Sequence, residues 1–199
     1  MNLIKILFFS LAIFSIQLTM AQPKAVTIPN FTLNDVITSQ PVSLTDFSSS
    51  KAIVVIFTSN TCPYSKLYED RILELSNKYK SKGVEFLLIN SNNSSLTDVD
   101  NVFRMRIKAN SKKFTFPYLE DKQSLVKNIF KSEKTPESFV LANKNGAFIL
   151  SYHGAIDDNP QSADLVKENY IELALNNIIK GKPSPVQYER PVGCRIKSE

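Results

Sequence analysis

The segment TCPYS at residues 61–65 decides the fold through its position between two regular patterns. Residues 52–57, AIVVIF, form an apolar run rich in β-branched side chains, which is typical of a strand buried on both faces of a sheet. Residues 64–79 carry aromatic or aliphatic side chains at spacings of four, four, three and four, which indicates an amphipathic helix. Pro63 suits the first turn of this helix. Cys62 is therefore expected where a buried strand ends and a helix begins.

This position favours a reactive thiol. The unpaired N–H groups and the dipole of a helix N-terminus stabilise an anion, so a cysteine placed there has a lowered pKa and is nucleophilic at neutral pH. Cys62 is thus the candidate nucleophile. Ser65 stands where a C-x-x-C motif would have its second cysteine, and the chain's other cysteine, Cys194, lies close to the C-terminus.

The first 21 residues have the pattern of a secretory signal peptide. Lys5 precedes an apolar run over residues 6–18, and the small residues Thr19 and Ala21 stand at the −3 and −1 positions of a cleavage site. The alternative is an uncleaved membrane anchor, for which the run falls short of the ~20 residues that a spanning helix needs. We expect an exported protein, periplasmic or extracellular, with no stable membrane insertion after cleavage. Its compartment would permit a disulfide.

The remaining chain divides into a domain over residues 22–180 and a proline-containing, extended tail over residues 181–199 that carries Cys194. The chain has 24 Lys and Arg against 19 Asp and Glu, a net charge of +5, and the basic residues are interspersed with acidic ones. This distribution indicates a solvated surface and no nucleic-acid partner. With one histidine and two cysteines, no metal site is expected, and we expect no cofactor.

The order of the expected elements begins with a β-α-β unit, which implies parallel strands joined by a right-handed crossover. Strands are predicted at 28–33, 41–44, 52–58, 84–90, 114–119, 135–141 and 146–152, and helices at 63–82, 98–109, 123–130 and 161–179. The tetrapeptide at residues 143–146 predicts a hairpin between the last two strands.

This order, with Cys62 at the first strand-to-helix junction and Thr135-Pro136 before the hairpin, resembles the thioredoxin-like superfamily over about residues 25–180. The insertion at 91–119 is similar to the redoxin branch, which includes alkyl hydroperoxide reductase and thiol-specific antioxidant proteins. Residues 154–159 (GAIDDN) and 193–197 (GCRIK) are similar to exported members of that branch. The resemblance implies an α/β fold with a central mixed sheet and helices on both faces. An N-terminal hairpin extension and an insertion after the first β-α-β unit complete the expected fold.

The resemblance also implies a redox enzyme and its site. In that family the counterpart of Cys62 is the nucleophile, and the counterpart of Pro136 is a cis-proline whose neighbouring backbone pairs with the substrate. A trans proline that starts a strand is the alternative. We therefore expect thiol–disulfide exchange or peroxide reduction, with a redox partner protein or a small peroxide or disulfide as substrate. The candidate site residues are catalytic Cys62 and Cys194 and substrate-binding Thr61, Pro63, Tyr64, Thr135 and Pro136; for Tyr64, packing in the helix stripe is the alternative role.

Two departures from the family pattern limit this interpretation. Ser65 cannot release a mixed disulfide as a second motif cysteine does. The peroxidatic motif Pro-x-x-x-Thr/Ser-x-x-Cys has its hydroxyl at Ser59 but has Val55 in place of the proline. Both departures also fit a non-catalytic binding or structural module.

Cys194 is the candidate to resolve Cys62, since loop-closure entropy grows only slowly with sequence separation. Three arrangements are consistent with the sequence. The two cysteines form a reversible disulfide, they form a permanent disulfide that pins the tail, or they do not meet and Cys194 pairs with another molecule. The sequence does not indicate an oligomeric state.

Overall fold

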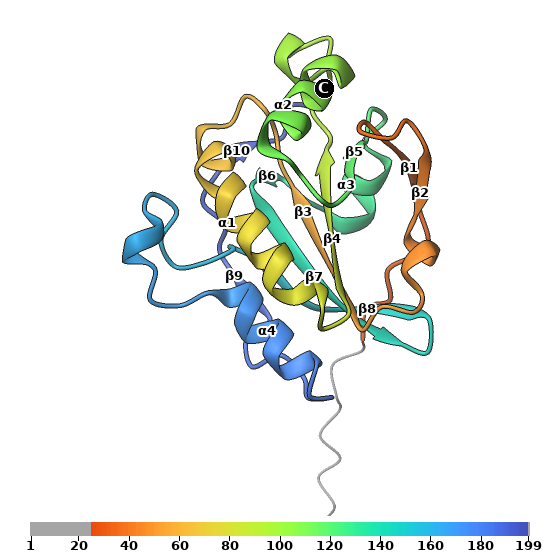
Figure 1. The fold of residues 1–199 in the computed structure, drawn as a ribbon, viewed down its shortest axis with the longest axis vertical. Coiled ribbons are helices and arrows are strands. Elements are labelled where there is room, and N and C mark those ends of the chain that lie inside the picture. The colour runs from red at the N-terminus through yellow and green to blue at the C-terminus, as the bar shows by residue number, and fades with distance from the viewer. Residues whose placement is uncertain (1–24, 199) are drawn as a thin grey trace, which may run out of the picture.

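An eight-stranded mixed sheet forms the centre of the structure, a computed structural model that describes residues 25–198 (Figure 1). Its strands, in spatial order, are β2 (Pro41–Ser43), β1 (Thr32–Asp35), β5 (Tyr118–Glu120), β4 (Val84–Asn90), β3 (Ala52–Phe57), β7 (Glu137–Lys144), β8 (Ala147–Gly154) and β9 (Tyr188–Glu189). The signal peptide predicted for residues 1–21 lies outside the described residues. Within residues 25–198, no helix is long and apolar enough to span a bilayer.

The predicted β-α-β unit is confirmed. β3 and β4 pair in parallel, and α1 (Pro63–Lys80) connects them. Every residue of β3 is buried, which agrees with its unbroken apolar sequence. β7 lies antiparallel on the other side of β3, so the strand that leads to Cys62 is held between two neighbours.

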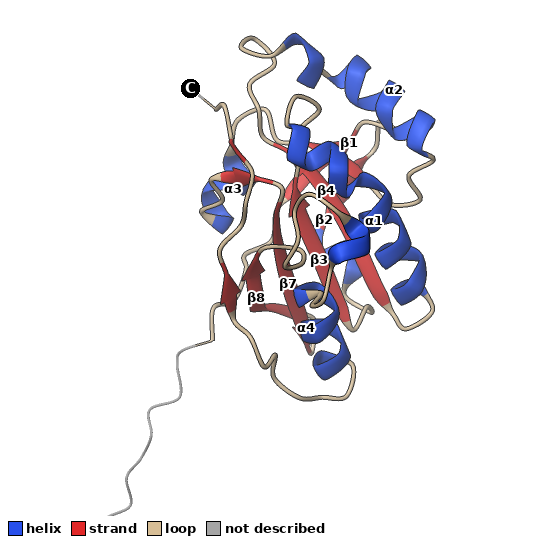
Figure 2. Ribbon diagram, turned by 90° about the vertical axis from the view of Figure 1, so that its left-hand side faces the viewer, coloured by secondary structure: helices blue, strands red, loops and turns tan. Residues whose placement is uncertain are grey.

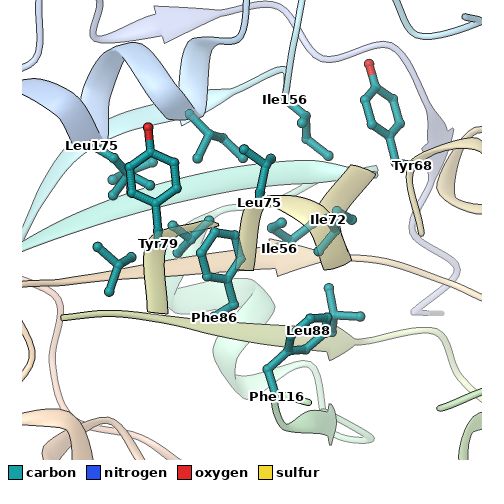
Figure 3. Close-up of a cluster of buried hydrophobic side chains, with 14 of the residues drawn as sticks. Ile56, Tyr68, Ile72, Leu75, Tyr79, Phe86, Leu88, Phe116, Ile156 and Leu175 are labelled. Atoms are coloured by element: carbon teal, nitrogen blue, oxygen red, sulfur yellow. The ribbon is translucent and has the colours of Figure 1, made fainter. Parts of the chain in front are cut away.

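Helices cover both faces of the sheet, as predicted. On one face, side chains of α1 and of α4 (Tyr170–Ile178) pack against β3 and β4 (Figure 3). α2 (Val102–Lys112) adds Met105 and Ala109 to this cluster. On the other face, α3 (Leu125–Phe130) and the N-terminal segment that includes Phe31 cover the alternate residues of β3. The antiparallel pair β1–β2 forms the predicted N-terminal hairpin extension at the sheet edge.

The predicted helix at residues 161–179 is wrong in its first half. A short 3-10 turn, η3 (Ala163–Leu165), replaces it, and α4 begins only at Tyr170. The reason is a competing set of contacts, because Asn169 caps α4 through Glu172 and also forms a bridge with Asp157. Leu165, which lies in this first half, is 64% exposed. The helix predicted at 98–109 is similarly split into η2 (Asp98–Asp100) and α2.

The C-terminal tail adds strands that the sequence did not predict. β9 extends the main sheet by pairing in parallel with β8, and β10 (Cys194–Arg195) pairs antiparallel with β6 (Lys134–Thr135). Figure 2 shows the tail passing from the β8 side of the sheet up towards α3 and the C-terminus. The tail therefore crosses the end of the molecule at which β6 and the N-terminus of α1 meet. The remaining short helix, η1 (Leu44–Phe47), follows β2.

Candidate active site

Cys62 lies at the N-cap position of α1, directly before Pro63. Its backbone N–H donates to Ser59 Oγ at 3.1 Å, and its carbonyl accepts the first helical hydrogen bond from Lys66. The side chain is 1% exposed. Cys62 thus lies at the positive end of the helix dipole, as the sequence predicts, and its side chain makes no capping hydrogen bond.

Cys62 is joined to Cys194 by a disulfide, with 5.8 Å between the two Cα atoms and a sequence separation of 132. This pairing excludes, for the structure described, the arrangement in which the two cysteines do not meet. It is consistent with both a reversible and a permanent bond.

The peptide bond between Thr135 and Pro136 is cis, which confirms that prediction. The Thr135 carbonyl oxygen lies 2.9 Å from Cys62 Sγ. Thr135 also pairs with Cys194 in the β6–β10 ladder. One residue beside the cis-proline thus contacts both halves of the disulfide.

The other candidate substrate-binding residues differ in their exposure to solvent. Thr61 and Tyr64 are half-buried, whereas Pro63 is exposed. Pro136 is buried and lines a pocket of ≈ 120 Å³ together with Tyr68, Asp157 and tail residues such as Val192. The Oγ1 atom of the buried Thr135 has no hydrogen-bond partner among the described residues.

Ser65, which stands where a C-x-x-C motif would have its second cysteine, stabilises the turn before Cys62. Its side chain is 1% exposed, and its Oγ accepts a hydrogen bond from the backbone N–H of Ser59 at 3.4 Å. Ser59 in turn accepts from the N–H of Cys62. Ser65 therefore stabilises the segment before Cys62.

Sequence reasoning missed a buried carboxylate, Asp100, that organises the same segment. Asp100 is 2% exposed. Its Oδ1 accepts from the backbone N–H of Asn60 at 2.6 Å and from Asn90 Nδ2 at 2.9 Å. Its Oδ2 accepts from Thr61 Oγ1 at 3.0 Å and from Asn92 Nδ2 at 2.8 Å. The two residues directly before Cys62 are thereby fixed to the insertion that follows β4.

The hydrogen-bond network around Asp100 also reaches the tail. Asn92 Oδ1 accepts from the backbone N–H of Lys197 at 2.8 Å, and the N–H of Asn93 donates to the Lys197 carbonyl at 2.6 Å. The only sequence signal for this network is the polar run that directly follows the buried strand β4, at the sheet edge where Cys62 also lies. The insertion thus holds both the segment before Cys62 and the tail.

The sequence of residues 25–158 matches the model of the AhpC/TSA family. The chain belongs to the AhpC/TSA family. This match includes Cys62 and the cis-proline segment but ends before the tail, so Cys194 lies outside the matched part of this AhpC/TSA chain. Together with the Cys62–Cys194 disulfide, the membership supports a thiol-based redox function.

Solved structures similar to this AhpC/TSA chain cover most of its length. An uncharacterized conserved protein from Geobacillus kaustophilus is 31% identical with a TM-score of 0.82, and the match covers 89% of this chain and 93% of that chain. A hypothetical protein from Sinorhizobium meliloti 1021 is 26% identical with a TM-score of 0.80, covering 88% of this chain and 94% of that chain. No curated protein sequence matches the chain.

A third similar solved structure shows that the fold is thioredoxin-like. A thiol:disulfide interchange protein of the thioredoxin family from Chlorobium tepidum TLS has a TM-score of 0.56 at 18% identity. That match covers 67% of this chain and 87% of that chain. The predicted fold class is thus confirmed.

Proposed function

We propose that the chain is an exported thiol–disulfide oxidoreductase in which Cys62 is the nucleophile and Cys194 is the resolving cysteine. The observation that carries this proposal is the position of Cys194, which is disulfide-bonded to Cys62 while its backbone pairs with Thr135 beside the cis-proline. Cys194 therefore has the placement that a cysteine of a bound peptide needs for exchange with Cys62.

The reaction proceeds through two exchange steps. The Cys62 thiolate attacks one sulfur of a partner disulfide, so that a Cys62–partner bond forms, the partner's S–S bond breaks and one partner thiolate leaves. The Cys194 thiolate then attacks Cys62 Sγ, which forms the Cys62–Cys194 bond and releases the second partner thiolate. Two electrons pass to the partner, and the reverse sequence oxidises a partner dithiol.

Each candidate residue has a part in these steps. The α1 N-terminus stabilises the Cys62 thiolate as attacking and as leaving group. The Thr135 backbone aligns the incoming segment, and Pro136 holds that backbone in place. Thr61, Pro63 and Tyr64 border the sulfur and provide contact surface for the partner.

Export rests on the signal-peptide pattern of residues 1–21, and the proposed location is periplasmic or extracellular. The fold relative named as a thiol:disulfide interchange protein supports the reaction class. An oxidising compartment also suits a protein whose two cysteines cycle between dithiol and disulfide.

Peroxide reduction is the second candidate, favoured by the AhpC/TSA membership. In that reaction the Cys62 thiolate would attack one peroxide oxygen, so that the O–O bond breaks, water or an alcohol leaves and Cys62 becomes a sulfenic acid. The Cys194 thiol would then condense with the sulfenic acid to form the disulfide and release water. The absence of the motif proline at Val55 argues for exchange as the main activity. A permanent Cys62–Cys194 bond in a non-catalytic module is the remaining alternative.

Single-cysteine variants separate these functions. The wild type, Cys62→Ser and Cys194→Ser are each reduced and then offered glutathione disulfide or hydrogen peroxide. We expect no reaction at Cys62→Ser and a stable mixed disulfide, detected by mass, at Cys194→Ser. Equal turnover in wild type and Cys62→Ser would exclude the nucleophile assignment, and faster turnover of peroxide than of disulfide would favour the second candidate.

A further inference from the structure

Residues 193–197 of the tail, here called the strap, lie extended beside Cys62. The surface that the strap covers, formed by residues 133–136 and the apolar side chains around Ile196, is here called the strip. Cys194 and Arg195 pair with Thr135 and Lys134, and the Ile196 N–H donates to the Glu133 carbonyl at 3.0 Å. Most of these contacts are made by backbone atoms. Backbone contacts do not distinguish one extended segment from another, so selectivity must come from the side-chain positions.

The position before the cysteine admits no side chain. A Cβ built on Gly193 would lie 2.7 Å from the carbonyl carbon of Thr135 and 3.1 Å from the nitrogen of Pro136, with the Thr135 carbonyl oxygen closer still. Both neighbours are backbone of the cis-proline segment, which cannot turn aside as a flexible side chain does. Only glycine fits at this position, because the strap backbone approaches the backbone of Thr135 and Pro136 so closely.

The side chain two residues after the cysteine occupies an apolar pocket. Ile196 is 5% exposed and belongs to the core cluster that contains Phe57 and Phe130. Arg195, between the pocket and the cysteine, is exposed. The strip therefore imposes glycine at one position and a branched aliphatic residue at another, and leaves the intervening position free.

We infer that this strip is the recognition site for the redox partner, and that it selects an extended segment of the form Gly-Cys-x-aliphatic, where the aliphatic residue is Ile, Leu or Val. The inference rests on the proposed function and names its substrate class. Because Cys62 bonds to one sulfur at a time and the strip has one set of backbone groups, strap and partner segment occupy it alternately.

Synthetic peptides test the selectivity directly. The probe is the heptapeptide VGCRIKS with blocked ends, whose cysteine is activated as a mixed disulfide with thionitrobenzoate. It is reacted with the reduced, full-length Cys194→Ser variant, and release of thionitrobenzoate gives the second-order rate constant for attack by Cys62. Three further peptides replace the glycine, the isoleucine or the arginine by alanine.

We expect the glycine and isoleucine replacements each to slow the reaction about tenfold, and the arginine replacement to change it by less than about twofold. Equal rates for all four peptides would overturn the inference. A small aromatic disulfide serves as a separate reagent for intrinsic reactivity. If Cys62 reacts with that reagent but not selectively with peptides, only the inference fails; if it reacts with neither, the proposed function fails as well.

Alternate occupancy has its own test. Adding Ile196→Ser to the Cys194→Ser background weakens the strap's hold on the pocket without touching Cys62. We expect the VGCRIKS rate to rise severalfold, and by more than the rate with the small disulfide, which reports the added exposure of Cys62 alone. An unchanged peptide rate would contradict competition between strap and partner.

Discussion

The side chain of Asp100 shows how much of the site depends on one residue. It is buried and accepts four hydrogen bonds, two of which come from the residues directly before Cys62. Replacing Asp100 by Asn puts an amide donor against groups that are themselves donors. We expect Asp100→Asn to lower the free energy of unfolding by about 2–4 kcal/mol, as measured by urea denaturation.

Asp98 provides the matched control for this substitution. It belongs to the same 3-10 turn, but it is exposed, and within residues 25–198 its Oδ1 accepts only from the nearby Asn101 side chain. Asp98→Asn should change stability by no more than about 0.5 kcal/mol. Similar losses for the two variants would contradict the role given to the Asp100 network.

His153 makes the stability of the protein depend on pH. Its ring stacks on Phe139 and lies 4.8 Å from the ring of Tyr188 in β9. Burial lowers the His153 pKa from its ordinary 6.5, although the charge of Glu137 partly opposes this shift. The unfolded chain then binds the proton more tightly than the folded one, so the contribution of His153 to stability is present above pH 6.5 and is lost as the pH falls through the folded pKa.

We therefore expect the wild type to lose stability on acidification below about pH 6.5, and His153→Gln to lose less over the same interval. Urea denaturation midpoints between pH 7.5 and pH 5 measure the difference. Parallel pH profiles for the two proteins would show that His153 titrates no differently in the folded and unfolded states.

At the level of single residues, sequence reasoning found the groups whose signal is local. Cys62 was predictable because a buried strand and an amphipathic helix adjoin it. The cis bond at Pro136 was predicted from the family resemblance, which rests on the order of the elements. Asp100 was not predictable, since it meets Asn60 across 40 residues and lies in the part of the predicted helix 98–109 that is a 3-10 turn in the structure.

Among the elements, β9 depends on a close approach at Gly154. This glycine has φ +126°, and a Cβ built on it would lie 2.8 Å from the carbonyl carbon of Glu189, with the carbonyl oxygen nearer. Alanine at this position must push β9 away from β8. We expect Gly154→Ala to destabilise the protein by about 2 kcal/mol more than Gly146→Ala.

Gly146 is the appropriate comparison because its φ is also positive, +87°, while nothing lies within 4 Å of its Cβ position. The difference between the two variants therefore isolates the contact with β9 from backbone strain. It is measured by urea denaturation of the oxidised proteins. Equal losses would mean that β9 contributes nothing to the stability of the sheet.

Elements with a long, regular pattern were predicted well, and those held by tertiary contacts were not. β3, α1 and β4 follow directly from their hydrophobic periodicity. The first half of the helix predicted at 161–179 is wrong because backbone bonds such as Asp158 N–H to Glu168 carbonyl close a loop there. β9 and β10, of two residues each, leave no periodic signal.

For the whole molecule, the disulfide ties the tail to a distant part of the domain. The closed segment has a sequence separation of 132 residues, so the bond restricts a large part of the unfolded chain. We expect reduction to lower the free energy of unfolding by about 2–4 kcal/mol, measured by denaturation with and without reductant.

The single variants Cys62→Ser and Cys194→Ser control for effects of the reductant itself. Each lacks the bond and should unfold at the same urea concentration whether or not reductant is present. If the wild type also shows no difference, the bond adds nothing to the stability of the domain.

The central claim is that Cys62 and Cys194 form a bond that opens and closes during function, and its equilibrium potential tests this most directly. The protein is equilibrated at pH 7 in a series of thiol–disulfide buffers, and the fraction of free thiols is measured by alkylation and mass. Because the α1 N-terminus stabilises the reduced Cys62 as thiolate, we predict a midpoint between about −180 and −270 mV, within the range of known oxidoreductases. A bond that stays closed until below about −300 mV would contradict the account and identify a permanent structural disulfide.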